Sequence, residues 1–105
     1  MPSPSECAHN YAREQITVST SAIGGTAALV NNTANYRSFK AQAATFEVVS
    51  GLVYYTFDGS TPSSTNGSRL AAGDVLNVSG HEKVEEIRFL RQAAPDAVVD
   101  AAYYY

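Results

Sequence analysis

The sequence predicts an all-β protein, a single small antiparallel β-sandwich or barrel of about six to seven short strands with an extended N-terminal arm. Runs rich in β-branched and aromatic residues recur along the chain, and these residue types suit the pleated, half-buried surface of a strand. Turn residues (Gly, Pro, Asn and Asp) separate the runs at roughly ten-residue intervals, as in sandwiches and barrels. The 105 residues make one domain.

The N-terminal segment, residues 1–13, is predicted to be a flexible arm, and residues 14–105 the sandwich or barrel domain. Pro2 and Pro4 stand in a stretch without periodicity, and such a stretch cannot form a core of its own. The arm either orders on a neighbouring subunit or remains a free terminus. It lacks the charged-then-apolar order of a secretory signal peptide, which favours a protein made in the cytoplasm.

The first half of the domain is predicted to hold three extended segments. Residues 15–20 alternate, with Ile16 and Val18 on one face and hydroxyl side chains on the other, which indicates a half-buried strand. Residues 26–30 offer a second, short strand. A long extended segment follows over residues 36–49.

Ser50 and Gly51 separate two apolar runs by two residues, which is the signal of a β-hairpin. The second run, residues 52–57, carries large side chains at adjacent positions, for example Tyr54 and Tyr55. Because adjacent residues of a strand point to opposite faces, this run is predicted to be a central strand that is covered on both sides.

A turn is predicted to end this strand. Gly59 can adopt a positive φ at no steric cost, and the side chain of Asp58 can accept a hydrogen bond from the backbone just after it. Pro62 cannot donate to a β-ladder, so no central strand continues through it. Asp58, Gly59 and Pro62 are therefore expected to form the turn.

The second half is predicted to be a loop followed by three strands. The loop covers residues 60–73, and the strands cover residues 74–79, 84–91 and 97–105. A helix over residues 82–92 is an alternative for the middle strand, because Val84, Ile87 and Arg91 stand at helical spacing. The Gly and Pro residues that flank this segment favour the strand.

No arrangement of side chains predicts catalysis, so the chain is not expected to be an enzyme. Cys7, His9 and His81 are too few and too scattered for a zinc site, and no metal or other cofactor is expected. Asp58 and Asp74 could pair as an acid and a base. Both, however, stand where turns favour Asp.

The charge balance argues against nucleic acid and the hydropathy against a membrane. The net charge is −3 and the seven basic residues are scattered, so there is no basic patch for phosphates. No stretch approaches the roughly 20 apolar residues of a membrane-spanning helix. Only 16% of the residues are charged, and a low charge reduces the desolvation cost of contact with other proteins.

Five tyrosines are candidates for a partner interface. Three of them end the chain, and because adjacent residues of a strand point to opposite faces, their rings cannot share one core. Tyrosine is enriched at interfaces because it combines a large apolar ring with a polar tip. Packing within an edge strand explains the end of the chain equally well. The candidate interface residues are Tyr11, Tyr54, Tyr103, Tyr104 and Tyr105.

The segment Tyr-Thr-Phe-Asp-Gly-Ser-Thr-Pro at residues 55–62 resembles a turn motif in the small C-terminal β-sandwich domain of chitobiase-type glycosidases. The resemblance covers only this segment and implies a non-catalytic module. A carbohydrate-binding β-module that takes a surface glycan is therefore an alternative function. Such a module needs exposed aromatic rings beside polar groups. The absence of Trp weighs against it, whereas Tyr54 or Tyr103 could supply the ring.

A second resemblance covers nearly the whole chain from Ile16. The pattern of strands and turns is similar to that of small β-sandwich proteins encoded among the structural genes of tailed bacteriophages. The loop at residues 63–68 and the N-terminal arm depart from that pattern, and both could be contact elements. The matching segments are a Thr/Ser-rich first strand, Phe46-Glu47-Val48, the turn from Asp58 to Pro62, Gly73-Asp74-Val75-Leu76, Ile87-Arg88-Phe89-Leu90-Arg91 and a last strand that ends in tyrosines.

This second resemblance implies a structural protein of the virion. The expected function is that of a capsid decoration or cement protein that binds the capsid surface, with a neck or tail accessory protein as the neighbouring alternative. The resemblance also implies a homo-oligomer that contacts other virion proteins, such as the major capsid protein or a connector or tail protein. Its location would be the virion, after synthesis in the host cytoplasm.

Overall fold

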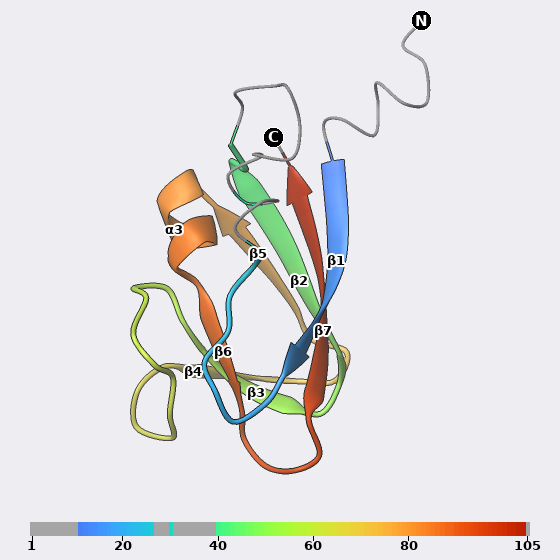
Figure 1. Cartoon of the computed structure of the whole chain (residues 1–105), viewed down its shortest axis with the longest axis vertical. Coiled ribbons are helices and arrows are strands. Elements are labelled where there is room, and N and C mark those ends of the chain that lie inside the picture. The colour runs from blue at the N-terminus through green and yellow to red at the C-terminus, as the bar shows by residue number, and fades with distance from the viewer. Residues whose placement is uncertain (1–10, 27–29, 31–39, 105) are drawn as a thin grey trace, which may run out of the picture.

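The computed structural model describes residues 11–26, 30 and 40–104, which form two antiparallel β-sheets packed as a sandwich (Figure 1). The larger sheet, in the order β1-β7-β2-β5, consists of β1 (Tyr11–Val18), β2 (Ala43–Ser50), β5 (Val75–Ser79) and β7 (Ala97–Tyr104). The smaller sheet, in the order β4-β3-β6, consists of β3 (Leu52–Thr56), β4 (Ser68–Ala71) and β6 (Arg88–Arg91). The helix α3 (His81–Glu86) connects β5 to β6. The predicted all-β fold is confirmed, as a sandwich.

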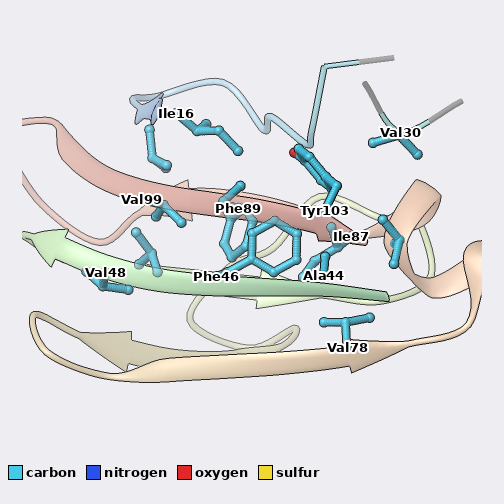
Figure 2. Close-up of a cluster of buried hydrophobic side chains, with 14 of the residues drawn as sticks. Ile16, Val30, Ala44, Phe46, Val48, Val78, Ile87, Phe89, Val99 and Tyr103 are labelled. Atoms are coloured by element: carbon cyan, nitrogen blue, oxygen red, sulfur yellow. The ribbon is translucent and has the colours of Figure 1, made fainter. Parts of the chain in front are cut away.

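The core fills the space between the two sheets (Figure 2). The rings of Phe46 and Phe89, from opposite sheets, meet edge to face with centroids 5.1 Å apart, and Phe46 meets Tyr103 in the same way at 6.2 Å. Such pairs add to the stabilisation that burial alone provides. Ile16 and Val18, predicted to share one face of the first strand, are both buried. The inward side of the larger sheet therefore follows the alternation in the sequence.

The first strand begins earlier than predicted. β1 pairs with β7 along its whole length, from Tyr11 opposite Tyr104 to Val18 opposite Ala97. Residues 11–13 therefore belong to the folded domain, and the predicted end of the arm at residue 13 is wrong. The pairing that extends β1 is with residues 102–104, near the other end of the sequence, which local pattern cannot reveal. Residues 1–10 lie outside the described residues.

The predicted hairpin at Ser50 and Gly51 is wrong, because the strands on either side belong to different sheets. β2 has an irregularity between Val48 and Ser50, and the chain then turns from the larger sheet into the smaller one. Gly51 has φ +84°, and a Cβ atom built there would lie 2.7 Å from the Cβ of Ala97. Only glycine fits this corner without strain.

β3 is the central strand of its sheet, as predicted, but it is covered on one side only. Val53 is fully buried against the core, whereas Leu52 is 47% exposed and Tyr54 is half-buried. The core lies on one side of this three-stranded sheet, and on the other side Thr56 is buried next to the following loop whereas Leu52 and Tyr54 remain accessible. The prediction that both faces are covered is therefore wrong.

Two further predictions fail in the second half. The expected loop over residues 60–73 contains β4, which pairs with β3. The expected strand over residues 84–91 is α3 followed by β6, so the helical alternative holds for its first part. Val84 and Ile87, three residues apart, are both fully buried. The strand predicted at residues 74–79 is confirmed as β5, and the one predicted at residues 97–105 is confirmed as β7 up to Tyr104, since residue 105 lies outside the described residues.

The segment between β1 and β2 is described only in part. Residues 27–29 of the strand predicted at residues 26–30 lie outside the described residues, and Val30 donates its backbone N–H to the carbonyl of Thr26 at 2.9 Å. Ile23 forms an isolated bridge with Phe89 on β6. The predicted segment 36–49 falls partly outside the described residues, and its strand begins at Ala43.

Candidate functional site

The predicted interface tyrosines occupy different environments. Tyr103 is fully buried, so its prediction as an interface residue is wrong, whereas its neighbour Tyr104 is 42% exposed. β7 lies between β1 and β2, so the end of the chain is not an edge strand. Tyr54 stands half-buried on β3. Tyr11 begins β1, and Tyr105 lies outside the described residues.

Tyr103 is part of a polar link that reaches from the core to the surface. Its hydroxyl donates to Oε2 of Glu14 at 2.5 Å. The same carboxylate accepts the N–H of Thr26 at 2.8 Å and the Thr26 hydroxyl at 2.5 Å. A buried hydroxyl needs such a partner, and this one joins β7 to β1 and to the loop after β1. The carbohydrate-binding alternative suggested that the Tyr103 ring could contact a sugar. Because the ring is fully buried, it cannot do so.

The outer side of the smaller sheet exposes apolar groups, and we call it the β3 face. Arg69 and Leu90 both lie directly opposite Tyr54, on β4 and β6 respectively, and Ala71 lies opposite Leu52. The guanidinium carbon of Arg69 is 5.6 Å from the centre of the Tyr54 ring, a cation–π contact. The β3 face therefore presents leucine and tyrosine side chains beside one exposed cation.

The outer side of the larger sheet, which we call the β7 face, combines charged and apolar groups. A hollow of about 210 Å³ lies among side chains of β1, β2 and β7, including Arg13, Glu47, Asp100 and Tyr104. Gln15 donates to Asp100 across the β1–β7 pair at 3.3 Å. The exposed side chains of Val75 and Tyr104 lie on the same face, so charged, amide and apolar groups are mixed there.

The predicted turn after β3 is confirmed. Gly59 has φ +79°, and Oδ1 of Asp58 accepts the backbone N–H of Ser60 at 3.1 Å and its hydroxyl at 2.5 Å. The Ser60 hydroxyl, followed by its N–H, lowers the pKa of Asp58 below 3.8. Pro62 is fully buried, which anchors the loop that follows.

Two other hollows are present in the described part of the chain. One, of about 430 Å³, lies between residues 22–26 and the pair Glu85 and Arg88. Arg88 donates there to the carbonyls of Glu85 and Ile87 at 2.9 and 2.7 Å, so this guanidinium serves the backbone. The other, of about 270 Å³, lies beside Phe57. The sequence did not predict the second hollow, because Phe57 continues the apolar run of the predicted strand 52–57, whereas β3 ends at Thr56 and Phe57 already belongs to the turn.

His81 and Asp74, which the sequence offered for metal binding and for acid–base catalysis, make structural contacts. The Nδ1 atom of His81 is 2.9 Å from the carbonyl oxygen of Ala41, and Nε2 is 3.4 Å from Glu85. Asp74 accepts the N–H of Ala71 in the turn between β4 and β5. Among the described residues, no three acidic, histidine or cysteine side chains gather where a metal ion could bind. Cys7 and His9 lie outside these residues.

No helix in residues 11–26, 30 and 40–104 is long and apolar enough to span a membrane. In the comparisons with known proteins, no protein-family model matches the chain, and no curated protein matches it significantly.

Proposed function

We propose that this chain is a non-enzymatic structural protein of a tailed-bacteriophage virion, and within that class a decoration or cement protein that binds the capsid surface. The proposal starts from the resemblance in the order of strands and turns. The two-sheet architecture is compatible with that resemblance. A neck or tail accessory protein remains the neighbouring alternative, and the experiment below separates the two.

The observation that carries the proposal is the β3 face. Leu52 is 47% exposed and stands beside the half-buried Tyr54 and Leu90. Apolar and aromatic groups with a flanking arginine are typical of the centre of a protein–protein interface. An assembly partner that covers this face would remove it from water.

The size of the domain supports the same conclusion. A domain of about 100 residues buries only about two-thirds of the surface of its unfolded chain, so its own core supplies limited stability. Burial of the β3 face in a repeated assembly would add to the stability that the core supplies. Closed symmetric oligomers are the usual form in which identical subunits gain such burial. We therefore expect contact both with copies of this chain and with another virion protein.

The test is the composition of purified particles. Phage particles from the cells that encode this chain are quantified by mass spectrometry, with the major capsid protein as the reference. We expect the chain in a fixed ratio of the order of one copy per few capsid subunits. A few copies per particle would place it in the neck or tail. Absence from particles, with the chain found only in the cell lysate, would overturn the proposal.

A pair of variants tests the role of the β3 face. Leu52→Ser removes an exposed leucine from this face, and Val75→Ser removes a 51% exposed valine from the larger sheet as the matched control. We expect Leu52→Ser to lower incorporation into particles several-fold, and Val75→Ser to leave it unchanged. Melting curves of both purified variants confirm that the fold is intact. Equal incorporation of both variants would mean that another surface makes the contact.

A further inference from the structure

A hollow of about 270 Å³ opens at the point where β3 runs into the turn at Asp58. The rings of Tyr55 and Phe57 form one wall, and they meet edge to face with centroids 5.4 Å apart. Phe57 remains 38% exposed. Asp58, Asn66 and Ser68 supply the polar side of the hollow. An aromatic surface thus faces solvent directly beside hydrogen-bonding groups.

The polar side of the hollow is held in place by its own hydrogen bonds. Oδ1 of Asp58 is bound by Ser60, and the amide nitrogen of Asn66 donates to the Ser60 hydroxyl at 3.0 Å and to the Thr61 carbonyl at 3.1 Å. These bonds fix the orientation of the Asp58 and Asn66 side chains at the edge of the hollow. Polar groups whose orientation is already fixed lower the entropic cost of binding.

The backbone around the hollow is also constrained. Gly67 has φ +117°, and a Cβ atom there would collide with the carbonyl oxygen of Tyr55. The loop therefore lies directly against β3 at this point. Thr56 donates its hydroxyl to the carbonyl of Ser60 at 2.7 Å, which ties the other end of the turn to the same strand. The hollow is a property of a fixed loop and not of side chains alone.

We propose that this hollow binds a neutral saccharide. A sugar ring presents C–H groups on one face, which pack on an aromatic ring, and hydroxyl groups around its edge, which donate to carboxylate and amide oxygens. Phe57 provides the apolar surface, and Asp58 and Asn66 provide the acceptors. Small-molecule sites commonly combine an apolar wall with a few fixed polar groups in this way.

The charges at the hollow disfavour other classes of ligand. Asp58 is ionised at neutral pH, since hydrogen bonds from Ser60 lower its pKa, and a carboxylate repels phosphates and other anions. No lysine or arginine is among the lining residues to compensate. Asp58 is also the one acidic residue in that lining, which is too few hard ligands for a tightly bound calcium ion. A neutral, hydroxyl-rich ligand meets none of these obstacles.

The test is a titration of the full-length 15N-labelled chain followed by NMR. The probes are glucose, galactose, mannose and N-acetylglucosamine, each raised to tens of millimolar. We expect at least one of them to shift amide resonances of residues 55–68 in a saturable manner. Phe57→Ala should weaken that binding by about tenfold or more, which corresponds to about 1.4 kcal/mol. Asp58→Asn, which retains the shape of the side chain, should weaken it less.

Tyr104→Ala is the matched control, because it removes an exposed aromatic ring from the β7 face and leaves the hollow intact. We expect this variant to bind as the unchanged chain does. Dispersed amide spectra show that each variant is folded. The proposal is overturned if no probe shifts residues 55–68, if the shifts cluster elsewhere, or if Phe57→Ala binds equally well. These outcomes are independent of the particle analysis, so either proposal can fail while the other stands.

Discussion

The two sheets share one core but contribute to it unequally. The smaller sheet places only two hydrophobic side chains in full burial, Val53 and Phe89. The larger sheet places a continuous apolar surface there, and β1, β2 and β7 each alternate between buried and more accessible positions. The buried residues of the larger sheet are Ile16, Val18, Ala44, Phe46, Val48, Val78, Ala97, Val99, Ala101 and Tyr103.

Because of this inequality, the residues that stabilise the fold and the residues for which we propose binding lie mostly in different sheets. The larger sheet supplies most of the buried core residues, and its outer β7 face carries charged groups beside exposed Val75 and Tyr104. The smaller sheet covers that core, and it carries both surfaces for which we propose a function, the β3 face and the hollow beside Phe57. Substitutions at these two surfaces should therefore cost little stability, whereas substitutions on the inner side of the larger sheet should cost much.

The largest expected effect comes from Phe46→Ala. The Phe46 side chain is fully buried between the sheets, and loss of such a ring costs about 3–5 kcal/mol of the free energy of unfolding. Tyr55→Ala, a comparable truncation of a half-buried ring on the smaller sheet, should cost about half as much or less. Urea titrations of both variants measure the difference. Equal losses would show that the two sheets contribute equally.

An intermediate effect is expected at the corner that joins the sheets. Gly51→Ala combines a positive φ with a collision against Ala97, and should cost at least about 2 kcal/mol. Gly59→Ala has a similar φ but open space around it, so it should cost about 1 kcal/mol. Thermal or urea unfolding distinguishes them. If Gly51→Ala lowers the free energy of unfolding less than Gly59→Ala does, the contact between Gly51 and Ala97 is not as tight as the structure indicates.

The smallest expected effect concerns pH. The pKa of Asp58 is lowered on folding, so the carboxylate stabilises the folded state at pH values above its unfolded pKa of about 3.8, and this contribution is lost as the pH falls through the folded pKa. Asp58→Asn should therefore flatten the fall in melting temperature below about pH 4. The change is small because the carboxylate is exposed to solvent. If the melting temperatures of the unchanged chain and of Asp58→Asn depend on pH in the same way, this carboxylate does not contribute to stability.

The strands of the larger sheet could be predicted because their signal is local. Ile16 with Val18, and Phe46 with Val48, alternate with more accessible residues within a few positions. The pairing of those strands is not local. Ser50 and Gly51 have the composition of a hairpin, and only the distant Ala97, which packs against Gly51, shows that the chain changes sheets there.

The candidate sites illustrate the same limit. β4 could not be predicted from the sequence, because a short edge strand forms through backbone pairing with its neighbour and needs no alternation of apolar residues. The sequence predicted that adjacent tyrosines at the end of the chain would face opposite ways, and Tyr103 and Tyr104 do so. Which of the two is buried depends on the register between β7 and its neighbours, and that register is set by contacts with β1 and β2.

The antiparallel pairing of β1 and β7 has a mechanical consequence. Tyr11 lies opposite Tyr104 at one end of the larger sheet, and the two strands leave the domain side by side (Figure 1). A force that pulls these two ends apart would peel the strands open one residue pair at a time, and would not shear all their hydrogen bonds at once. The hydrogen bond from Tyr103 to Glu14 lies close to that end and holds β7 to β1 there. An assembly that bears load through this domain would therefore hold it by its faces and not by its two ends.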